Sequence, residues 1–340
     1  MRLLEQRWSV DMKALAATGY GPSQDLRIID LPVPMAGPGQ IQVRIKATTI
    51  NPTDLRVITG EYKDMLPVEF PYVPGNEFAG TVTAAGPGVT NYRAGDEVFG
   101  QALPRQLRAV TSPTRPSIST GALAEYAVFE ADTLLLAHRP ASVPPEQAAA
   151  LAIAGMTARA IVKIAAMKRG ETALVIGATG GVGTSLLPLL SHAGVRTIAT
   201  ARSPEGRDLV SRLGAETVIT PDPATYPKNV DVVFNLALFA DRIAEAGQSL
   251  RPGGKMVTIM FPAATQQELG RDDVELHFML DMDGHYGGMP DVAEAAESGI
   301  LTVEIARVFP FEEAVAAVVA YASEKPLGKI VVSFGDSQAA

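Results

Sequence analysis

The feature that most restricts the fold is a run with four glycines in seven residues, Gly177-Ala178-Thr179-Gly180-Gly181-Val182-Gly183. It follows an apolar segment typical of a buried strand, residues 173–177, and precedes a helical pattern, 184–193, that Pro188 is expected to kink. Glycines there permit a tight turn and close approach of a ligand, while the helix N-terminus offers N–H donors and the positive end of its dipole. This order of elements predicts a dinucleotide-binding turn.

The rest of the chain shows two kinds of sequence pattern. Residues 13–136 alternate short apolar runs with Pro-Gly and Gly-Pro turns, which predicts an antiparallel, partly barrel-like β domain. Later residues predict a parallel sheet covered by helices on both faces, with a helix at 146–166 and strands at 173–177, 197–201, 217–220, 231–235 and 255–260. A helix at 311–324 and a strand at 329–334 follow, and we expect that strand to return to the first domain.

The second strand of the parallel sheet predicts which dinucleotide binds. It ends at Thr200-Ala201-Arg202-Ser203, and no Asp or Glu occurs between Thr197 and Pro204 to accept from a ribose 2′-hydroxyl. Arg202 can pair with a 2′-phosphate, Ser203 can donate to it, and Arg207 is a second cation one helical turn on. This favours NADP(H), and the alternative is that Arg202 is an ordinary exposed arginine. The turn residues expected to contact the cofactor are Thr179, Gly180, Gly181 and Val182.

Charge and cysteine content exclude several classes of function. Asp and Glu number 37 against 29 Lys and Arg, a net charge of -8, so nucleic acid and membrane surfaces are not expected partners. The sequence has no cysteine, which excludes disulfides, thiolate nucleophiles, iron–sulfur clusters and any zinc site that needs a Cys ligand. Met1 to Asp11 lacks the apolar run of a signal peptide, so we expect a cytoplasmic protein.

From Met12 to Phe334 the sequence resembles the medium-chain dehydrogenase/reductase superfamily, in its zinc-free quinone oxidoreductase branch. The glycine turn is one mark of this resemblance. The others are Asn51-Pro52-Thr53-Asp54, Gly60-Glu61-Tyr62, Pro74-Gly75-Asn76-Glu77-Phe78-Ala79-Gly80, Gly95-Asp96-Glu97-Val98, Gly121-Ala122-Leu123-Ala124-Glu125-Tyr126, Gly155-Met156-Thr157-Ala158, Leu250-Arg251-Pro252-Gly253-Gly254 and Gly328-Lys329-Ile330.

The resemblance implies an α/β protein with two domains. A GroES-like β-barrel catalytic domain would span 12–137 and be completed by 285–340, and a Rossmann NADP-binding domain with a doubly wound parallel sheet would span 138–284. A homodimer is expected, because members of the branch commonly pair through edge strands of the Rossmann sheet. Zinc-dependent members use a Cys and a Gly-His-Glu motif, where this chain has Asn51 and Asn76. No catalytic zinc is expected, since an amide is a poor zinc ligand.

The resemblance also implies roles for individual residues. Tyr62 would be a hydrogen-bond donor or proton source, and Asn51 would orient the nicotinamide ribose or the acceptor. Thr157 would approach the nicotinamide. Asn235 would border the adenosine half of the cofactor, and Met260 and Phe261 the nicotinamide half. The alternatives are a packing role for Tyr62, a turn residue at Asn51 and a hydroxyl bonded to its own helix at Thr157.

Together these features predict a zinc-independent, NADPH-dependent oxidoreductase that transfers hydride to a quinone or an α,β-unsaturated carbonyl compound. Such acceptors delocalise the charge that they gain and need less electrophilic help than a simple ketone. The alternative is an NADPH-binding sensor or crystallin-like protein with little turnover.

Three other patterns in the sequence have both a functional and a structural interpretation. Tyr321-Ala-Ser-Glu-Lys325 has the Tyr-x-x-x-Lys spacing of short-chain dehydrogenases, but Pro326 ends the helix at once, and a surface helix end is expected. His277 and Asp281 would share a helical face, and with Asp283 and His285 they fit no standard metal signature. Residues 101–120 carry three arginines and no acid, as either a solvated connection or a substrate lid.

Overall fold

The computed structural model describes residues 11–103 and 121–335, so most of the predicted connection or lid at 101–120 lies outside the described residues. The described chain divides into two compact units. The first contains residues 11–103, 121–139, 308–325 and 330–335, and the second contains 140–307 and 326–329.

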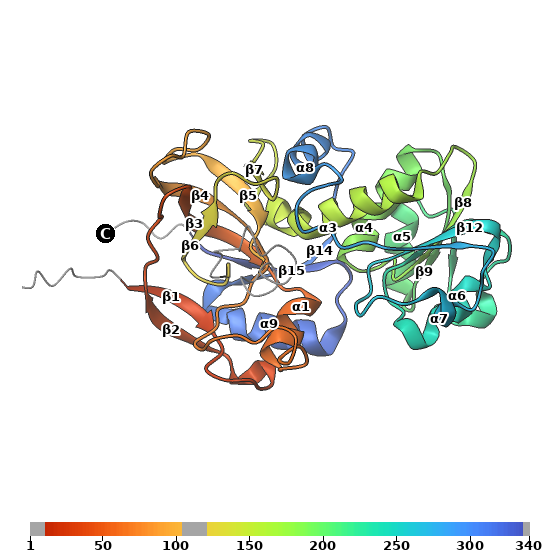
Figure 1. Ribbon diagram of the computed structural model, residues 1–340, viewed down its shortest axis with the longest axis horizontal. Helices are drawn as coiled ribbons and strands as arrows, with labels where there is room; N and C mark the ends of the chain where they lie inside the picture. The colour runs from red at the N-terminus through yellow and green to blue at the C-terminus, as the bar shows by residue number, and fades with distance from the viewer. Residues whose placement is uncertain (1–10, 104–120, 336–340) are drawn as a thin grey trace, which may run out of the picture. The chain divides into compact units, whose positions relative to one another are not determined.

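The first unit is built on antiparallel strands, as the alternating pattern predicts. β1 (Asp11–Ala16) and β2 (Arg27–Pro32) pair with each other (Figure 1). The larger sheet has the order β14-β15-β3-β4-β5-β7, with β6 also on β3. Its bounds are β3 Gln40–Thr49, β4 Glu77–Ala85, β5 Glu97–Gln101, β6 Tyr126–Glu130, β7 Leu136–His138, β14 Ile305–Pro310 and β15 Lys329–Ser333. The helices are η1 Ser23–Asp25, α1 Pro52–Ile58, η4 Phe311–Glu313 and α9 Ala314–Glu324.

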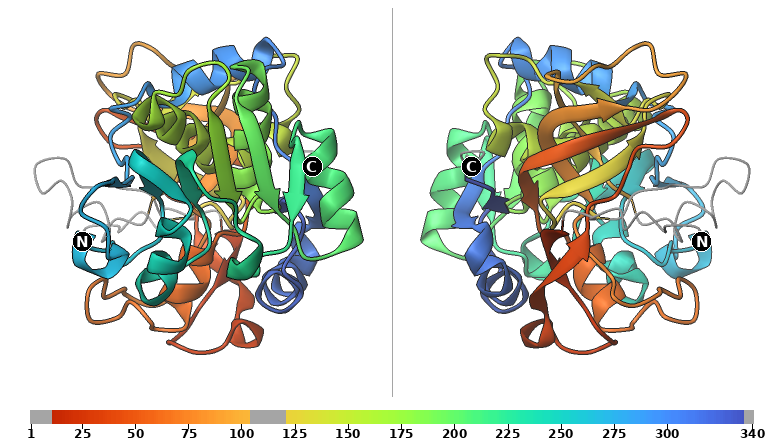
Figure 2. Two further views of the ribbon diagram at one scale, coloured as in Figure 1. Left: turned by 90° about the vertical axis from the view of Figure 1, so that its right-hand side faces the viewer. Right: turned by 90° about the vertical axis from the view of Figure 1, so that its left-hand side faces the viewer.

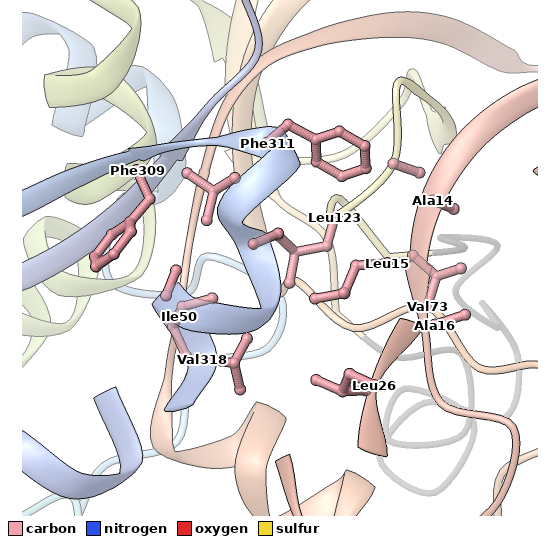
Figure 3. Close-up of a cluster of buried hydrophobic side chains, with 14 of the residues drawn as sticks. Ala14, Leu15, Ala16, Leu26, Ile50, Val73, Leu123, Phe309, Phe311 and Val318 are labelled. Carbon is pink, nitrogen blue, oxygen red and sulfur yellow. The ribbon is translucent and has the colours of Figure 1, made fainter. Parts of the chain in front are cut away.

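The C-terminal segment completes the first unit, as expected. Val331 of β15 pairs with Thr49 of β3 in antiparallel register. One buried cluster joins side chains that are distant in sequence, among them Leu15 of β1, Leu123, and Val318 of α9 (Figure 3). The removal of this apolar surface from water is the main force that holds α9 and η4 against the N-terminal strands.

The second unit contains a six-stranded parallel sheet in the order β10-β9-β8-β11-β12-β13. The strands are β8 Thr172–Ile176, β9 Arg196–Thr200, β10 Thr217–Ile219, β11 Val230–Asn235, β12 Leu250–Thr258 and β13 Glu275–Phe278. The helices are α3 Pro145–Ala165, α4 Gly181–His192, α5 Pro204–Arg212, η2 Pro223–Thr225, η3 Ala240–Arg242, α6 Ile243–Gly247, α7 Gln266–Leu269 and α8 Gly288–Glu297.

Both faces of the parallel sheet are covered (Figure 2). Ala173 and Val175 of β8 belong to one buried cluster with residues of α3 and α4. Leu174 and Ile176 belong to another cluster with residues of α6. Successive side chains of a strand point to opposite faces, so the strand is apolar throughout. α3 is long and apolar enough to cross a membrane, but 67% of its most apolar window is buried inside the protein, as in a core helix.

The structure departs from the sequence prediction at several boundaries. β13 was not predicted: His277 lies in this edge strand and not on a helical face with Asp281. α4 begins at Gly181, three residues before the predicted start, because the glycines already adopt helical geometry there. The division between the units falls at residue 308 and not at 285, because α8 packs on α3 and Gly155 of α3 lies against Val292 and Leu301.

A carboxylate in the first unit carries a strong electrostatic signature. Partial burial alone would raise the pKa of Glu97, but hydrogen bonds from Arg139, Lys46 and Thr81 lower it to about 2. Arg139 Nη2 lies 2.7 Å from Glu97 Oε2, and Lys46 Nζ and Thr81 Oγ1 lie 2.9 and 2.7 Å from Oε1. These contacts join β3, β4 and β5 to the segment after β7, so ionised Glu97 stabilises the sheet.

We expect Glu97→Gln to lower the free energy of unfolding by about 1 kcal/mol at pH 7. The carboxylate has a lower pKa in the folded state than in the unfolded state, so its contribution is complete above about pH 4.5 and is lost as the pH falls toward 2. Thermal unfolding followed by circular dichroism should therefore show the difference from wild type shrinking below pH 4.5. Glu69→Gln, at an exposed carboxylate, is the control, and a difference that does not change with pH contradicts the assignment.

Candidate functional site

The predicted dinucleotide turn lies between β8 and α4 in the second unit. Gly177 has a φ of 86°, and its N–H donates to Thr200 Oγ1 at the end of β9, at 3.1 Å. A Cβ on Gly183 would lie 2.4 Å from the carbonyl oxygen of Ala178. Glycine is therefore required at both positions, by backbone conformation at the first and by packing at the second.

The start of α4 offers the donors that an anion needs. Gly180 is the N-cap, and beside it the space for a Cβ has no neighbour nearer than Gly177 O at 3.6 Å. The first helical hydrogen bond is Thr184 N to Gly180 O, at 2.9 Å. The amides of the first turn have no acceptor within the helix, and they lie at the positive end of its dipole. The predicted residues Thr179 to Val182 are thus all at this helix start.

Lys329 is a second feature of the turn, and the sequence prediction did not assign it a role. A Cβ on Gly181 would lie 2.5 Å from Lys329 Cδ, so the lysine stem lies directly on the glycine turn. The same segment is tied to the turn by Gly328 N, which donates to Thr179 O at 2.8 Å. Lys329 is 5% exposed, so this lysine is buried with its stem at the start of α4. Gly328-Lys329-Ile330 was available in the sequence only as a mark of family resemblance.

The predicted phosphate residues follow β9 and begin α5. Arg202 is exposed, and Arg207 is half-buried one turn into the helix. Ser203 is the N-cap of α5, and its Oγ accepts from Gly206 N at 3.1 Å. Hydrogen bonds from its own backbone amide and from the Ser203 hydroxyl lower the pKa of Glu205. The structure thus gives Ser203 a capping role, and it leaves the two arginines at the start of α5.

The other predicted cofactor residues of the second unit share one edge of the sheet. Asn235 ends β11 opposite Ile176 of β8 and Thr258 of β12, and Met260 and Phe261 follow β12. Because the strands are parallel, their carboxyl ends meet at the edge that carries the glycine turn. Thr157 is half-buried on α3.

Asn235 has a structural role in its own turn. It is fully buried, and its amide nitrogen donates to Leu238 O and Thr258 Oγ1, at 2.8 and 3.1 Å. Its amide oxygen accepts from the N–H groups of Ala237 and Leu238. A bond from this amide to a cofactor would need one of these internal bonds to break.

In the first unit, Asn51 belongs to a buried polar network. It caps α1 in a capping box with Asp54, as the predicted alternative of a turn residue requires, and it also makes side-chain contacts outside the turn. Asn51 Nδ2 donates to Glu77 Oε1 at 2.9 Å, and Thr49 Oγ1 donates to the same oxygen. Asp54 accepts from the N–H groups of Asn51 and Gly75, each at 2.8 Å. Two buried carboxylates thereby fix the loops that carry Asn51 and Asn76.

Tyr62 lies beyond the other end of α1, a helix about 10 Å long. Its Oη accepts a hydrogen bond from Arg56 Nη1 at 2.6 Å, and the guanidinium carbon lies 5.6 Å from the centre of the tyrosine ring. Arg56 is itself close to Glu61, with 3.5 Å between Nε and Oε1. The half-buried phenol is therefore held beside a fixed cation, which favours negative charge on any group bound next to it.

Tyr321 was predicted to lie at a surface helix end, but its side chain is partly buried. α9 does end at Glu324, and Lys325 adopts a left-handed conformation with a φ of 49°. The Tyr321 ring, however, packs against the buried cluster of the first unit. Burial raises its pKa, and the charges of Asp54 and Glu77 raise it further. The same two causes, burial and then Asp54, raise the pKa of Tyr72. The sequence analysis placed Tyr321 at a surface helix end and did not single out Tyr72, because only the fold brings the two phenols within the electrostatic influence of Asp54.

The cluster of His277, Asp281, Asp283 and His285 is not a metal site, because Asp281 instead holds a backbone turn. Asp281 accepts from the backbone N–H groups of Gly284 and His285 through Oδ1, at 2.8 and 3.0 Å, and of Tyr286 through Oδ2, at 3.0 Å. His277 pairs with Glu275 at 2.8 Å. Among residues 11–103 and 121–335, no group of three or more His, Asp or Glu side chains could hold a metal ion.

Comparison with known proteins places this geometry in a family. Residues 37–139 match the alcohol dehydrogenase GroES-like domain, and residues 213–332 match a family described as zinc-binding dehydrogenase. A chloroplast envelope quinone oxidoreductase homolog of Arabidopsis thaliana is 32% identical over 264 residues, which cover 71% of this chain and 75% of the relative. The chloroplastic NADPH-dependent alkenal/one oxidoreductase of the same plant is 30% identical, over 73% of this chain and 62% of the relative.

A solved structure agrees over nearly the whole chain. Mycobacterial Rv1454c complexed with NADPH is 27% identical, with a TM-score of 0.80, and the match covers 95% of this chain and 99% of the other. The two matched domains, the glycine turn at the edge of the parallel sheet and the quinone oxidoreductase relatives agree with one another. The chain therefore belongs to the medium-chain dehydrogenase/reductase superfamily, together with its quinone oxidoreductase-like members.

Proposed function

We propose that this protein is an NADPH-dependent reductase of quinones or α,β-unsaturated carbonyl compounds and that it works without zinc. The observation that carries the proposal is the set of groups at one edge of the parallel sheet: the open turn at Gly180, the stem of Lys329 on Gly181, and the two arginines that follow β9. The relatives support it, since one is named an NADPH-dependent alkenal/one oxidoreductase and another was solved with NADPH.

NADPH fits the groups of the second unit. The amides at the start of α4 and Lys329 would hold the pyrophosphate, and Arg202 with Arg207 would hold the 2′-phosphate. Between Thr197 and Pro204 no carboxylate is present to accept from the 2′-hydroxyl of NADH. The next acid, Glu205, is turned back onto the cap of its own helix.

A catalytic zinc ion does not fit the corresponding groups of the first unit. Asn51 presents its amide N–H to Glu77, which also accepts from Thr49. A neutral amide nitrogen has no lone pair to give a metal, and the Glu77 oxygen that accepts from two donors is already satisfied. Polarisation of the acceptor then falls to hydrogen-bond donors, which favours substrates that delocalise charge.

When bound, NADPH supplies the hydride for this chemistry. Tyr62 would donate a hydrogen bond or a proton to the acceptor oxygen, and Arg56 holds the phenol in place at 2.6 Å. Asn51, fixed by Glu77 and Asp54, would orient the reacting groups. A small displacement of either side chain would lower the rate of hydride transfer, because productive geometry tolerates little displacement.

The proposal is tested with a panel of acceptors. We expect the oxidation of NADPH, followed at steady state by absorbance, to proceed with quinones and 2-alkenals, and simple alcohols to give no turnover with NADP. The assay is repeated after treatment with a metal chelator, which should leave the rate unchanged. Turnover of alcohols alone would overturn the proposal. Tight NADPH binding without reduction of any acceptor would favour a sensor or crystallin-like protein.

Removing the arginine after β9 tests the choice of cofactor. We expect Arg202→Ala to raise the KM for NADPH by at least about tenfold, because a charge-assisted hydrogen bond to the 2′-phosphate is lost. The KM for NADH should change little. Arg212→Ala, an exposed arginine in the last turn of the same helix, is the matched control. Equal losses for both cofactors would refute the phosphate role of Arg202.

Removing one hydroxyl tests the proton source. We expect Tyr62→Phe to lower kcat by about 100-fold, the scale of general acid catalysis, with the Kd for NADPH unchanged in fluorescence titration. Tyr92→Phe is the control, since the Tyr92 hydroxyl donates to Leu136 O at 3.3 Å within the same unit. A Tyr62→Phe enzyme with normal kcat would assign this ring to packing.

A further inference from the structure

We propose that Thr200 is a positioning residue that sets the preference for NADPH over NADH by tying the glycine turn to the segment that carries Arg202. The inference rests on the proposed NADPH binding and adds a residue that the cofactor prediction did not include. It is drawn from the contact between two parallel strands at their carboxyl ends, within the second unit.

The contact is a buried side-chain hydrogen bond. Thr200 is the last residue of β9 and is 3% exposed. Its Oγ1 accepts from Gly177 N at 3.1 Å, directly after β8 ends at Ile176. Gly177 adopts a left-handed conformation, with a φ of 86°, and its carbonyl accepts from Gly180 N at 3.2 Å. The Thr200 hydroxyl is therefore the acceptor that completes the turn, and its loss would leave a partly buried amide without this partner.

The same residue begins the phosphate segment. Arg202 follows Thr200 by two residues, so their Cα atoms are at most about 7 Å apart. The pairing of β8 with β9 ends at Val175 and Ala199, and the Thr200 bond is the contact that ties the glycine turn to the Arg202 segment beyond that point. Packing also joins the two segments. A Cβ on Gly206 of α5 would lie 3.2 Å from Cγ2 of Thr179 in the glycine turn, so α5 lies close against that turn.

This spacing matters for one cofactor more than for the other. NADPH and NADH would both use the amides of the glycine turn, but only NADPH has a phosphate for Arg202. Two anionic groups of one rigid ligand bind together only when their partners are held at the right separation, so a loosened junction loses preorganisation for NADPH. For NADH the loss is confined to the turn itself.

The test compares Thr200→Val and Thr200→Ser, with the KM for NADPH and for NADH and the thermal midpoint measured for each. We expect Thr200→Val to raise the KM for NADPH by about tenfold and the KM for NADH by much less, and Thr200→Ser to restore the wild-type preference. Thr197→Val is the matched control. It removes a buried hydroxyl of the same strand that donates to Val195 O at 3.5 Å.

The outcomes separate the possibilities. Equal increases for both cofactors, or an unchanged preference, would overturn the positioning role while leaving NADPH binding intact. A preference lost in Thr200→Ser as well would show that the hydroxyl is not the cause, and would also overturn it. If Thr200→Val does not fold, Thr200→Ala removes the hydroxyl without placing a methyl group against Gly177 N, and its preference decides. A wild-type enzyme without a preference for NADPH would refute the proposed cofactor and this inference together.

Discussion

The second unit depends on a junction that only glycine can make. Between β8 and α4 the chain turns through a left-handed residue at Gly177 and then packs Gly183 against the backbone of Ala178, with no room for a Cβ. This geometry aims the first amides of α4 along the carboxyl edge of the sheet. The return of residues 326–329 across the turn, with Gly328 bonded to Thr179 and Lys329 lying on Gly181, is possible for the same reason.

The first unit depends on hydrogen bonds to buried carboxylates. Asp54 and Glu77 are 1% and 0% exposed, and each is satisfied by donors from the loops around α1. A buried carboxylate without such donors would cost several kcal/mol. The network therefore fixes the positions of Asn51 and Gly75, and with them the loops on which the proposed chemistry depends.

Much of the architecture could be predicted from the sequence. The strands from β8 to β12 lie within a few residues of their predicted places, except that β12 begins earlier, because apolar runs between turn residues carry a strong local signal. The return of the last strand to the first unit was also foreseen, and β15 pairs with β3. β13 was missed because Glu275-Leu276-His277-Phe278 is short and half polar, and its strand state comes from pairing with β12.

The site shows the same division. The amino-acid sequence by itself determined the glycine turn, the missing acid after β9 and the absence of cysteine, because these are properties of residue type and spacing along one chain. Only the tertiary structure decided that Lys329 lies on Gly181, that Thr200 accepts from Gly177, and that Tyr321 packs on the buried cluster within the electrostatic influence of Asp54 and Glu77. Sheet pairing and core packing bring these residues together although they are distant in the chain, which no local pattern encodes.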